Sequence, residues 1–415
     1  MHRVAVASVL VLLAFAVAAS PARAQTTVVE GQTEGGAFYR IEMPPTWNGK
    51  LVIWNHGFDL GPVGPVDDTG PLALVHLLEG YATAASSYRQ NGWAVFDTSR
   101  DLELLVEAFE SEFGVPDEVL LYGASLGGIV TAAALEQADL GNLTGALAIC
   151  GAMAGSRNWD GAIDVRLLYD WVCRKVPEAA LPGGGGGLPP GAAPTPALVA
   201  QAVNACTGVD LPAGERTRTQ RRNLKKLLKF AKIPEQFVQI VMGYATFALA
   251  DLIQDPDKLD GKQGVGNANV DYGKKRVNRQ IERVETQRGA ERRLTRNFTP
   301  DGDVGSAKVV SLHTDKDGLV IVENQHSYAQ VVPPDKLTVA VVVEEEPTHC
   351  GFSPAEVYTG WQGLISWIGS GIQPTASDLG QVCPDIAAIL GGPCRFDPSF
   401  QLKSIDRRIR PRDPS

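Results

Sequence analysis

The sequence lacks the features that define several large classes of protein. Its 415 residues carry a net charge of −9, so it has none of the basic excess that nucleic-acid-binding proteins need. Six cysteines are too few for a small disulfide-built scaffold and can form only accessory bridges. No nucleotide-binding motif and no metal-ligand spacing stands out, so we expect no cofactor and no metal ion. The length and the 44% hydrophobic content instead suit one large α/β domain with an insertion.

The first 24 residues have the pattern of a secretory signal peptide. Arg3 precedes an apolar run over 4–19, and Ala22-Arg23-Ala24 offers a cleavage site. The alternative, a membrane anchor, needs about 20 apolar residues, and this run is shorter. No later stretch is long and apolar enough to cross a bilayer. We therefore expect a secreted or periplasmic protein without a membrane span, in a compartment that permits disulfides.

Strand-like and helix-like segments alternate in two separate parts of the chain. This alternation predicts a mostly parallel sheet with helices on both faces. The expected strands are short apolar runs at 39–43, 51–54, 81–86, 118–122, 143–149, 308–312 and 337–343. The expected helices lie between or after them, at 101–113, 129–136, 322–331 and 356–368.

The interval 155–305 interrupts this alternation. We expect it to be a mainly helical lid inserted between two parts of one core, 25–154 and 306–370, with helices at 220–232 and 234–254. It contains 23 Lys/Arg and 17 Asp/Glu, a net charge of +6 in an acidic protein. This charge reflects either solvated helix faces that dock on the core or a positive lid that steers an anionic substrate. The tail, 371–415, is expected to be irregular apart from a disulfide.

Aromatic residues of the insertion have two interpretations. They form either the interior of the lid or the wall of an acyl pocket, because lids control substrate access. The residues concerned are Trp159, Tyr169, Trp171, Phe237, Tyr244, Phe247 and Tyr272.

The segment Gly123-Ala124-Ser125-Leu126-Gly127 gives the strongest indication of chemistry. It follows an expected buried strand and precedes an expected helix, the context in which G-x-S-x-G presents a nucleophilic serine on a sharp turn. The two glycines leave room at the turn because they lack Cβ atoms. The helix directs its first N–H groups at the site, which favours negative charge there. We expect Ser125 to be a nucleophile; the alternative is a structural glycine turn.

A serine hydroxyl needs a base, usually a histidine held by a carboxylate. His349 lies in a loop after the last expected strand and is the expected base. His313, at a strand end, is expected to be packed or hydrogen-bonded, and His326 to lie on a helix surface. Asp315 and Asp317 compete for the carboxylate role. Asp317 is preferred because it lies on the turn that leads away from the strand.

The order of Ser125, Asp317 and His349 on these elements resembles the α/β-hydrolase superfamily, over about 40–154 and 306–370. The resemblance implies an α/β-hydrolase fold and a Ser-His-Asp triad. The local sequences at 80–88 and 349–352 resemble those of secreted bacterial esterases and prolyl-oligopeptidase-like hydrolases.

The resemblance also implies an oxyanion hole of two backbone N–H groups. One is that of Leu126, the residue after the nucleophile. The other comes from the loop after the family's third strand, which the resemblance places at Asn55-His56-Gly57-Phe58, and is assigned to Phe58. The side chain of His56 then orients this loop.

The six cysteines allow 15 connectivities. Proximity along the chain favours Cys173–Cys206 and Cys383–Cys394. Cys150 and Cys350 remain, and both are expected near the same edge of the sheet, where a bridge would pin the histidine loop. The alternative is one or more free, buried thiols.

Three functions from different classes fit these residues. The first is a secreted serine hydrolase that cleaves carboxylic esters, small or polymeric, through an acyl-enzyme. The second is a secreted serine peptidase or amidase with the same triad, although nothing in the chain encodes the large β-propeller of prolyl oligopeptidases. The third is a binding protein on a hydrolase fold, against which the apparently complete triad argues.

Overall fold

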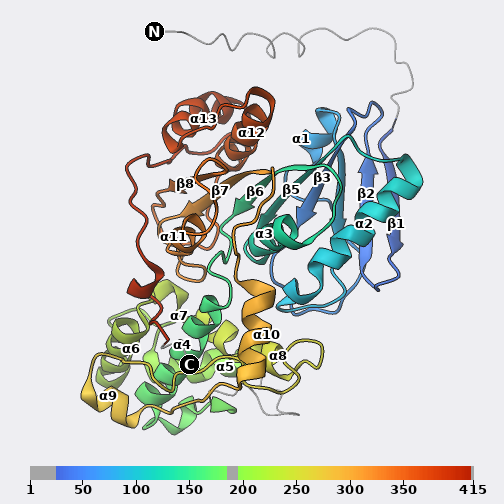
Figure 1. Ribbon diagram of the computed structural model, residues 1–415. Coiled ribbons are helices and arrows are strands. Elements are labelled where there is room, and N and C mark those ends of the chain that lie inside the picture. The colour runs from blue at the N-terminus through green and yellow to red at the C-terminus, as the bar shows by residue number, and fades with distance from the viewer. Residues whose placement is uncertain (1–24, 185–194, 413–415) are drawn as a thin grey trace.

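An eight-stranded, mostly parallel sheet organises the protein (Figure 1). The computed structural model describes residues 25–184 and 195–412, and the predicted signal peptide lies outside them. The strand order is β1-β2-β4-β3-β5-β6-β7-β8, with β2 antiparallel to β1 and β4 and the other pairs parallel. This arrangement confirms the expected α/β-hydrolase fold. The strands are Thr27–Gln32, Phe38–Met43, Lys50–Asn55, Ala82–Ser86, Glu118–Ala124, Leu143–Ile149, Lys308–Thr314 and Leu337–Val342, in chain order.

Apolar clusters cover both faces of the sheet. Alternate residues of the central strands point to opposite sides, so both sets of side chains are buried. In β3, Leu51 and Ile53 join the apolar cluster that includes α2 and α3, whereas Val52 joins the cluster around Trp361 of α12. The strands therefore read as continuous apolar runs. The helices that accompany the sheet are α1 (Ala73–Leu78), α2 (Thr98–Phe113), α3 (Leu126–Gln137), α11 (Asn324–Ala329), α12 (Pro354–Ser370) and α13 (Ala376–Leu390).

The interval 155–305 forms a second, helical body at one end of the sheet, in the lower part of Figure 1. The strongly amphipathic α6 begins at a capping box in which Thr217 and Gln220 satisfy each other's backbone N–H groups. The described helices here are α4 (Arg157–Cys173), α5 (Pro196–Thr207), α6 (Arg218–Ala231), α7 (Val238–Gly243), α8 (Leu249–Gln254), α9 (Lys275–Gln280) and α10 (Arg288–Phe298).

The structure corrects two expectations about the ends of the core. The first strand, β1, was not expected from the sequence, and it extends the sheet by pairing with β2. The expectation of an irregular tail is wrong, because α13 packs on α12 within it. Its start carries a capping box made by Thr375 and Asp378, a signal that the sequence contained.

The helical run Glu235–Gln254 corrects a third expectation. It is one continuous run of 20 residues that is long and apolar enough to cross a membrane by length and composition, whereas no such later stretch was expected. Instead of one regular helix, it consists of a 3₁₀ turn, α7, a π-helical segment over Tyr244–Ala248, and α8. Of its most apolar window, 61% is buried inside the protein, which is typical of a core helix.

Candidate active site

Ser125 occupies a strained turn between β5 and α3. Its φ of 58° lies in the left-handed region, which is uncommon for a residue other than glycine. Its backbone N–H donates to the carbonyl of Ile149 at the end of the neighbouring strand β6, at 2.9 Å. This geometry presents the serine side chain at the carboxyl edge of the sheet, as expected of a G-x-S-x-G turn.

The two glycines of the motif are required by close backbone contacts. A Cβ atom on Gly127 would lie 1.8 Å from the carbonyl oxygen of Asn55, and one on Gly123 would lie 2.3 Å from the carbonyl oxygen of Gly127. Both distances are far inside van der Waals contact. The turn therefore exists only because neither residue carries a side chain.

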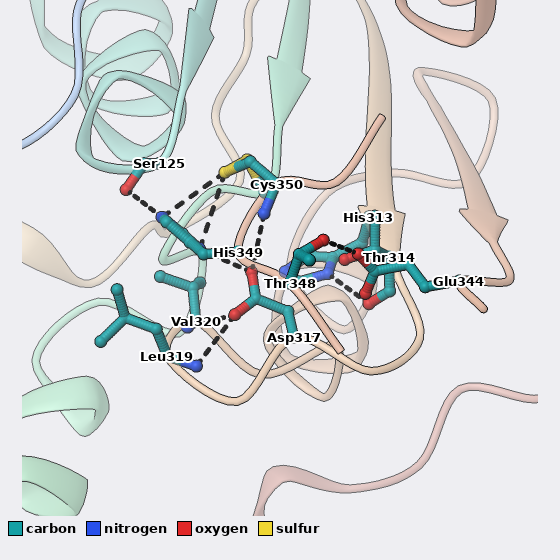
Figure 2. The surroundings of a disulfide bond; sticks show 11 residues. Ser125, His313, Thr314, Asp317, Leu319, Val320, Glu344, Thr348, His349 and Cys350 are labelled. Carbon is teal, nitrogen blue, oxygen red and sulfur yellow. Dashed lines mark hydrogen bonds and ion pairs between the residues drawn. A yellow bond between two sulfur atoms is a disulfide. The ribbon is translucent and has the colours of Figure 1, made fainter. Parts of the chain in front are cut away.

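His349 lies between Ser125 and Asp317 and is hydrogen-bonded to both (Figure 2). Its Nε2 is 2.8 Å from Ser125 Oγ, and its Nδ1 is 2.7 Å from Asp317 Oδ2. A carboxylate only accepts, so Nδ1–H donates to Asp317 and Nε2 is left to accept from the serine hydroxyl. The three expected side chains thus form one continuous hydrogen-bond chain, in the orientation that lets a histidine take a proton from a serine.

Asp317 is fully buried, and its charge is held by backbone donors. Its Oδ1 accepts from the N–H groups of Leu319 at 2.9 Å and Val320 at 3.1 Å. The competing acid, Asp315, instead accepts from the N–H of Glu344 at 2.8 Å. This bond orients the loop after β8, and within the described structure no hydrogen bond joins Asp315 to His349.

The remaining histidines do not join this chain of hydrogen bonds. His313 is buried, donates from Nδ1 to the carbonyl of Thr314, and has a pKa lowered by burial. His326 is half-buried on α11, so the expectation of a surface position holds only partly. His76 is buried against the rings of aromatic neighbours, and burial lowers its pKa to about 3.

The loop after β3 lies beside the serine. A Cβ atom on Gly57 would be 3.7 Å from Ser125 Cβ. The His56 ring stacks on Tyr88 and its Nδ1 is 2.8 Å from the carbonyl of Gly57, contacts that fix the loop. Within the described residues, the N–H groups of Phe58 and Leu126 meet no acceptor, so both remain available to a ligand.

Cys350 follows His349 directly and lies at disulfide distance from Cys150, at the end of β6 (Figure 2). Its Sγ is 3.5 Å from His349 Nε2, so the bridge packs against the imidazole. The pairs Cys173–Cys206 and Cys383–Cys394 also lie at disulfide distance, which gives the three pairs expected from the sequence. Three such pairs suit an oxidising, extracellular environment.

One group of potential metal ligands lies in the site. Polar atoms of Asp317, His349 and Cys350 all lie within 4.8 Å of one another. However, the Cys350 sulfur is bonded to Cys150 and is not a thiolate, and the other two groups are hydrogen-bonded to each other. The donor set therefore fits a proton-transfer pair better than a metal site.

An apolar cavity of about 120 Å³ opens beside Ser125. The sheet domain contributes Phe58 and Leu126, the insertion contributes Trp159 and Tyr244, and the C-terminal segment contributes Ile409. Burial, with the Asp317 charge nearby, raises the pKa of Tyr244 to about 12, so its hydroxyl stays protonated. The cavity is thus formed by three distant parts of the chain.

The aromatic residues singled out in the insertion divide between the two expected roles. Trp159 and Tyr244 line the cavity. Phe247 is half-buried beside a separate hollow next to Phe58. The others are buried in the interior of the insertion: Tyr169, Trp171, Phe237 and Tyr272.

The C-terminal segment supports the site in a way that the sequence analysis missed. Residues 401–412 run from the sheet domain to the insertion (Figure 1). Within them, Arg408, Ile409 and Arg410 line the cavity. Nearer the histidine loop, Arg395 donates to the carbonyl of Gly351 at 2.8 Å and pairs with Glu356. No local pattern marks these arginines, because their partners are far away in the sequence.

Comparisons with known proteins give partial similarities. No protein-family model matches the chain. An o-phthalyl amidase of Xanthobacter agilis is 29% identical over 110 residues, which are 26% of this chain and about a quarter (23%) of that relative.

Solved structures with a similar fold include two fungal hydrolases. An esterase from Aspergillus oryzae has a TM-score of 0.46 and 15% identity, over 84% of this chain and 80% of that one. Candida antarctica lipase A has a TM-score of 0.39 and 12% identity, over 94% and 89%. These similarities concern the fold, which the sheet topology already defines.

Proposed function

We propose that the protein is a secreted serine hydrolase that cleaves carboxylic esters through an acyl-enzyme. The observation that supports this proposal is the hydrogen-bond chain from Ser125 Oγ through His349 to the buried Asp317. In this proposal, Ser125, His349 and Asp317 form the catalytic triad, and the interval 155–305 acts as a lid over the cavity. Export is supported by the three cysteine pairs at disulfide distance.

In the acylation step, Ser125 Oγ attacks the carbonyl carbon of the ester while His349 Nε2 takes the hydroxyl proton. Asp317 holds the imidazolium that forms and keeps Nδ1 protonated. The oxygen that becomes negative accepts from the N–H groups of Phe58 and Leu126. His349 then returns the proton to the alkoxide that leaves, which gives the alcohol and an acyl-serine.

In the deacylation step, a water molecule takes the place of the alcohol. His349 removes one proton from it as its oxygen attacks the acyl carbon, and the same two N–H groups hold the second oxyanion. Return of the proton to Ser125 Oγ releases the carboxylic acid. One ester and one water thus give one acid and one alcohol, and the protein returns to its starting state.

Amide cleavage is the second candidate. It is favoured by the partial sequence similarity to a protein named o-phthalyl amidase. The same side chains would serve, except that His349 would protonate a leaving amine instead of an alkoxide.

The test compares the purified protein with Ser125→Ala on nitrophenyl esters of increasing acyl length and on peptide anilides. Ester turnover that disappears in the variant supports the proposal. Turnover of anilides alone would replace it with the amidase function. Equal turnover in both proteins would remove Ser125 from the mechanism altogether.

A further inference from the structure

Four charged residues line the mainly apolar cavity beside Ser125: Asp164, Lys232, Arg408 and Arg410. Three of them are cations, so the cavity is unusual for a site that would receive only a hydrocarbon chain. What each cation can do for a ligand depends on whether its donors are already used by the protein.

Two of the three cations already bind other groups of the protein. Arg410 donates to the carbonyl of Phe230 at 2.6 Å, lies over the ring of Tyr272 and is 3.8 Å from Asp164. Lys232 Nζ donates to the backbone carbonyl of Arg407. The acid, Asp164, is itself taken up by the hydroxyl of Tyr272 at 2.6 Å and by Arg412 at 3.1 Å. These groups hold the C-terminal segment against the insertion.

Arg408 is different. In the part of the chain that the structure describes, its guanidinium makes no hydrogen bond, and its one ion pair, with Glu323, is long at 3.8 Å. Its side chain is 25% exposed. Burial lowers the pKa of Arg408, and the charges of Glu323 and Asp317 only partly offset this effect. A partly buried guanidinium that makes no hydrogen bond within the described structure is therefore present in the wall of the cavity.

Trp159 adds a second unused donor. It is 4% exposed, it lines the same cavity, and its indole N–H has no hydrogen-bond partner in the described structure. A buried N–H without an acceptor costs free energy, which a ligand oxygen would recover. Among the described residues, the apolar wall thus contains one cation that makes no hydrogen bond and one N–H without an acceptor.

We propose that this cavity binds a substrate whose apolar part carries a carboxylate, and that Arg408 binds this carboxylate while the Trp159 N–H donates to an oxygen of the same substrate. This assignment rests on the proposed function and specifies its substrate class. The planar guanidinium fork matches the two oxygens of a carboxylate. A single free guanidinium also suits one negative charge better than the two of a phosphate.

The size of the cavity limits the apolar part. A dry cavity of 150 Å³ in another protein is known to hold benzene, and this one has about 120 Å³. It therefore fits a group of about one aromatic ring or a short branched chain.

The test measures binding without turnover, in Ser125→Ala protein. Calorimetric titration compares monomethyl terephthalate and monomethyl isophthalate with the methyl esters of 4- and 3-isopropylbenzoic acid, in which an uncharged group of the same shape replaces the carboxylate. A second arm places the charge on the alcohol side, with 4-acetoxybenzoate against 4-isopropylphenyl acetate. In one arm, the charged ester should bind about 10- to 100-fold more tightly than its uncharged partner, the range for a hydrogen bond to a charged group. This ratio of affinities is the anion preference.

Substitutions then show which residue causes the anion preference. Arg408→Gln should abolish it, whereas the neighbouring exposed Arg407→Gln should retain it. Glu323→Gln should increase it, because it removes the carboxylate that competes for Arg408. Trp159→Phe keeps a ring in place and should weaken both members of a pair by a similar factor. Opposite shifts in Arg408→Gln and Glu323→Gln cannot arise from partial unfolding alone.

Equal affinity for the charged and uncharged esters in both arms would overturn the inference, as would a preference that survives Arg408→Gln. Wild-type turnover of the same esters separates this failure from that of the proposed function. Turnover that depends on Ser125 but shows no anion preference rejects the carboxylate site alone. Anion binding that depends on Arg408 without ester turnover supports the site and rejects the esterase.

Discussion

Arg395 and Glu356 form a two-point ion pair that joins the segment after α13 to the first turn of α12. Nε donates to Oε1 at 3.0 Å and Nη2 to Oε2 at 2.8 Å, and the Glu356 side chain is fully buried. Arg395 also holds the carbonyl of Gly351, two residues after His349. The predicted irregular tail is thus a brace behind the histidine loop.

Arg395→Met should lower the free energy of unfolding by about 2 to 3 kcal/mol, because it leaves the buried Glu356 charge without its partner. Urea unfolding measures the loss. The same substitution at Arg100, whose partners Glu103 and Glu107 are on the surface, should cost less than about 1 kcal/mol. Similar losses in the two variants would show that the Arg395 pair does not brace the structure.

The Cys150–Cys350 pair should matter for turnover as well as for stability. Chain entropy predicts a loss of about 5 kcal/mol for removal of this bridge, whose cysteines have a sequence separation of 200. The corresponding loss is about 3 kcal/mol for Cys383–Cys394, with a separation of 11. Double alanine variants test this in urea. Loss of the first bridge should also lower kcat/KM by about 10- to 100-fold, because His349 is less well positioned. An equal fall in activity in both variants would contradict a special role beside the histidine.

His76 should make the protein less stable in acid. Burial lowers its pKa from 6.5 to about 3 in the folded state, so between these values the unfolded chain binds a proton that the folded chain does not. Stability therefore falls as the pH falls from about 6.5 toward 3, by up to about 1.4 kcal/mol per pH unit. Urea unfolding at several pH values should show a shallower dependence in His76→Phe. Identical slopes in the two proteins would reject this assignment.

Gly127→Ala should prevent formation of the serine turn. Its Cβ would overlap the carbonyl oxygen of Asn55, which belongs to β3 and cannot move without disturbing the sheet. We expect loss of soluble folded protein or of all activity. Gly369→Ala is the control, because open space surrounds its position near the end of α12 and alanine favours a helix by about 1 kcal/mol. A soluble, active Gly127→Ala protein would contradict the steric argument.

The fold was largely predictable because its signals are local. Apolar runs such as 51–54 and 118–122 indicate strands buried on both faces. Since parallel strands end at the same edge of a sheet, Ser125, Asp317 and His349, which follow strand ends, could be expected to meet. The preference for Asp317 over Asp315 was less secure, because it depended on the direction of a single turn.

The wall of the cavity was not predictable, because it depends on contacts between segments that are distant in the sequence. Nothing near Arg408 in the sequence indicates that it reaches the cavity. Nothing near Trp159 indicates that its N–H meets no acceptor among the described residues. The helix α13 is a different case, because it begins at a capping box, Thr375 with Asp378, which is a local signal in the sequence.

The paired cysteines also determine what a protease can separate. A cut between Cys173 and Cys206 leaves one fragment with Cys150 and Cys173 and another with Cys206 and Cys350, so two bridges still join the pieces. A cut elsewhere between 151 and 349 leaves the bridge beside His349 in place. Such nicked protein would migrate as one species until it is reduced, so a protein with these bridges would keep its parts together after the backbone is cut.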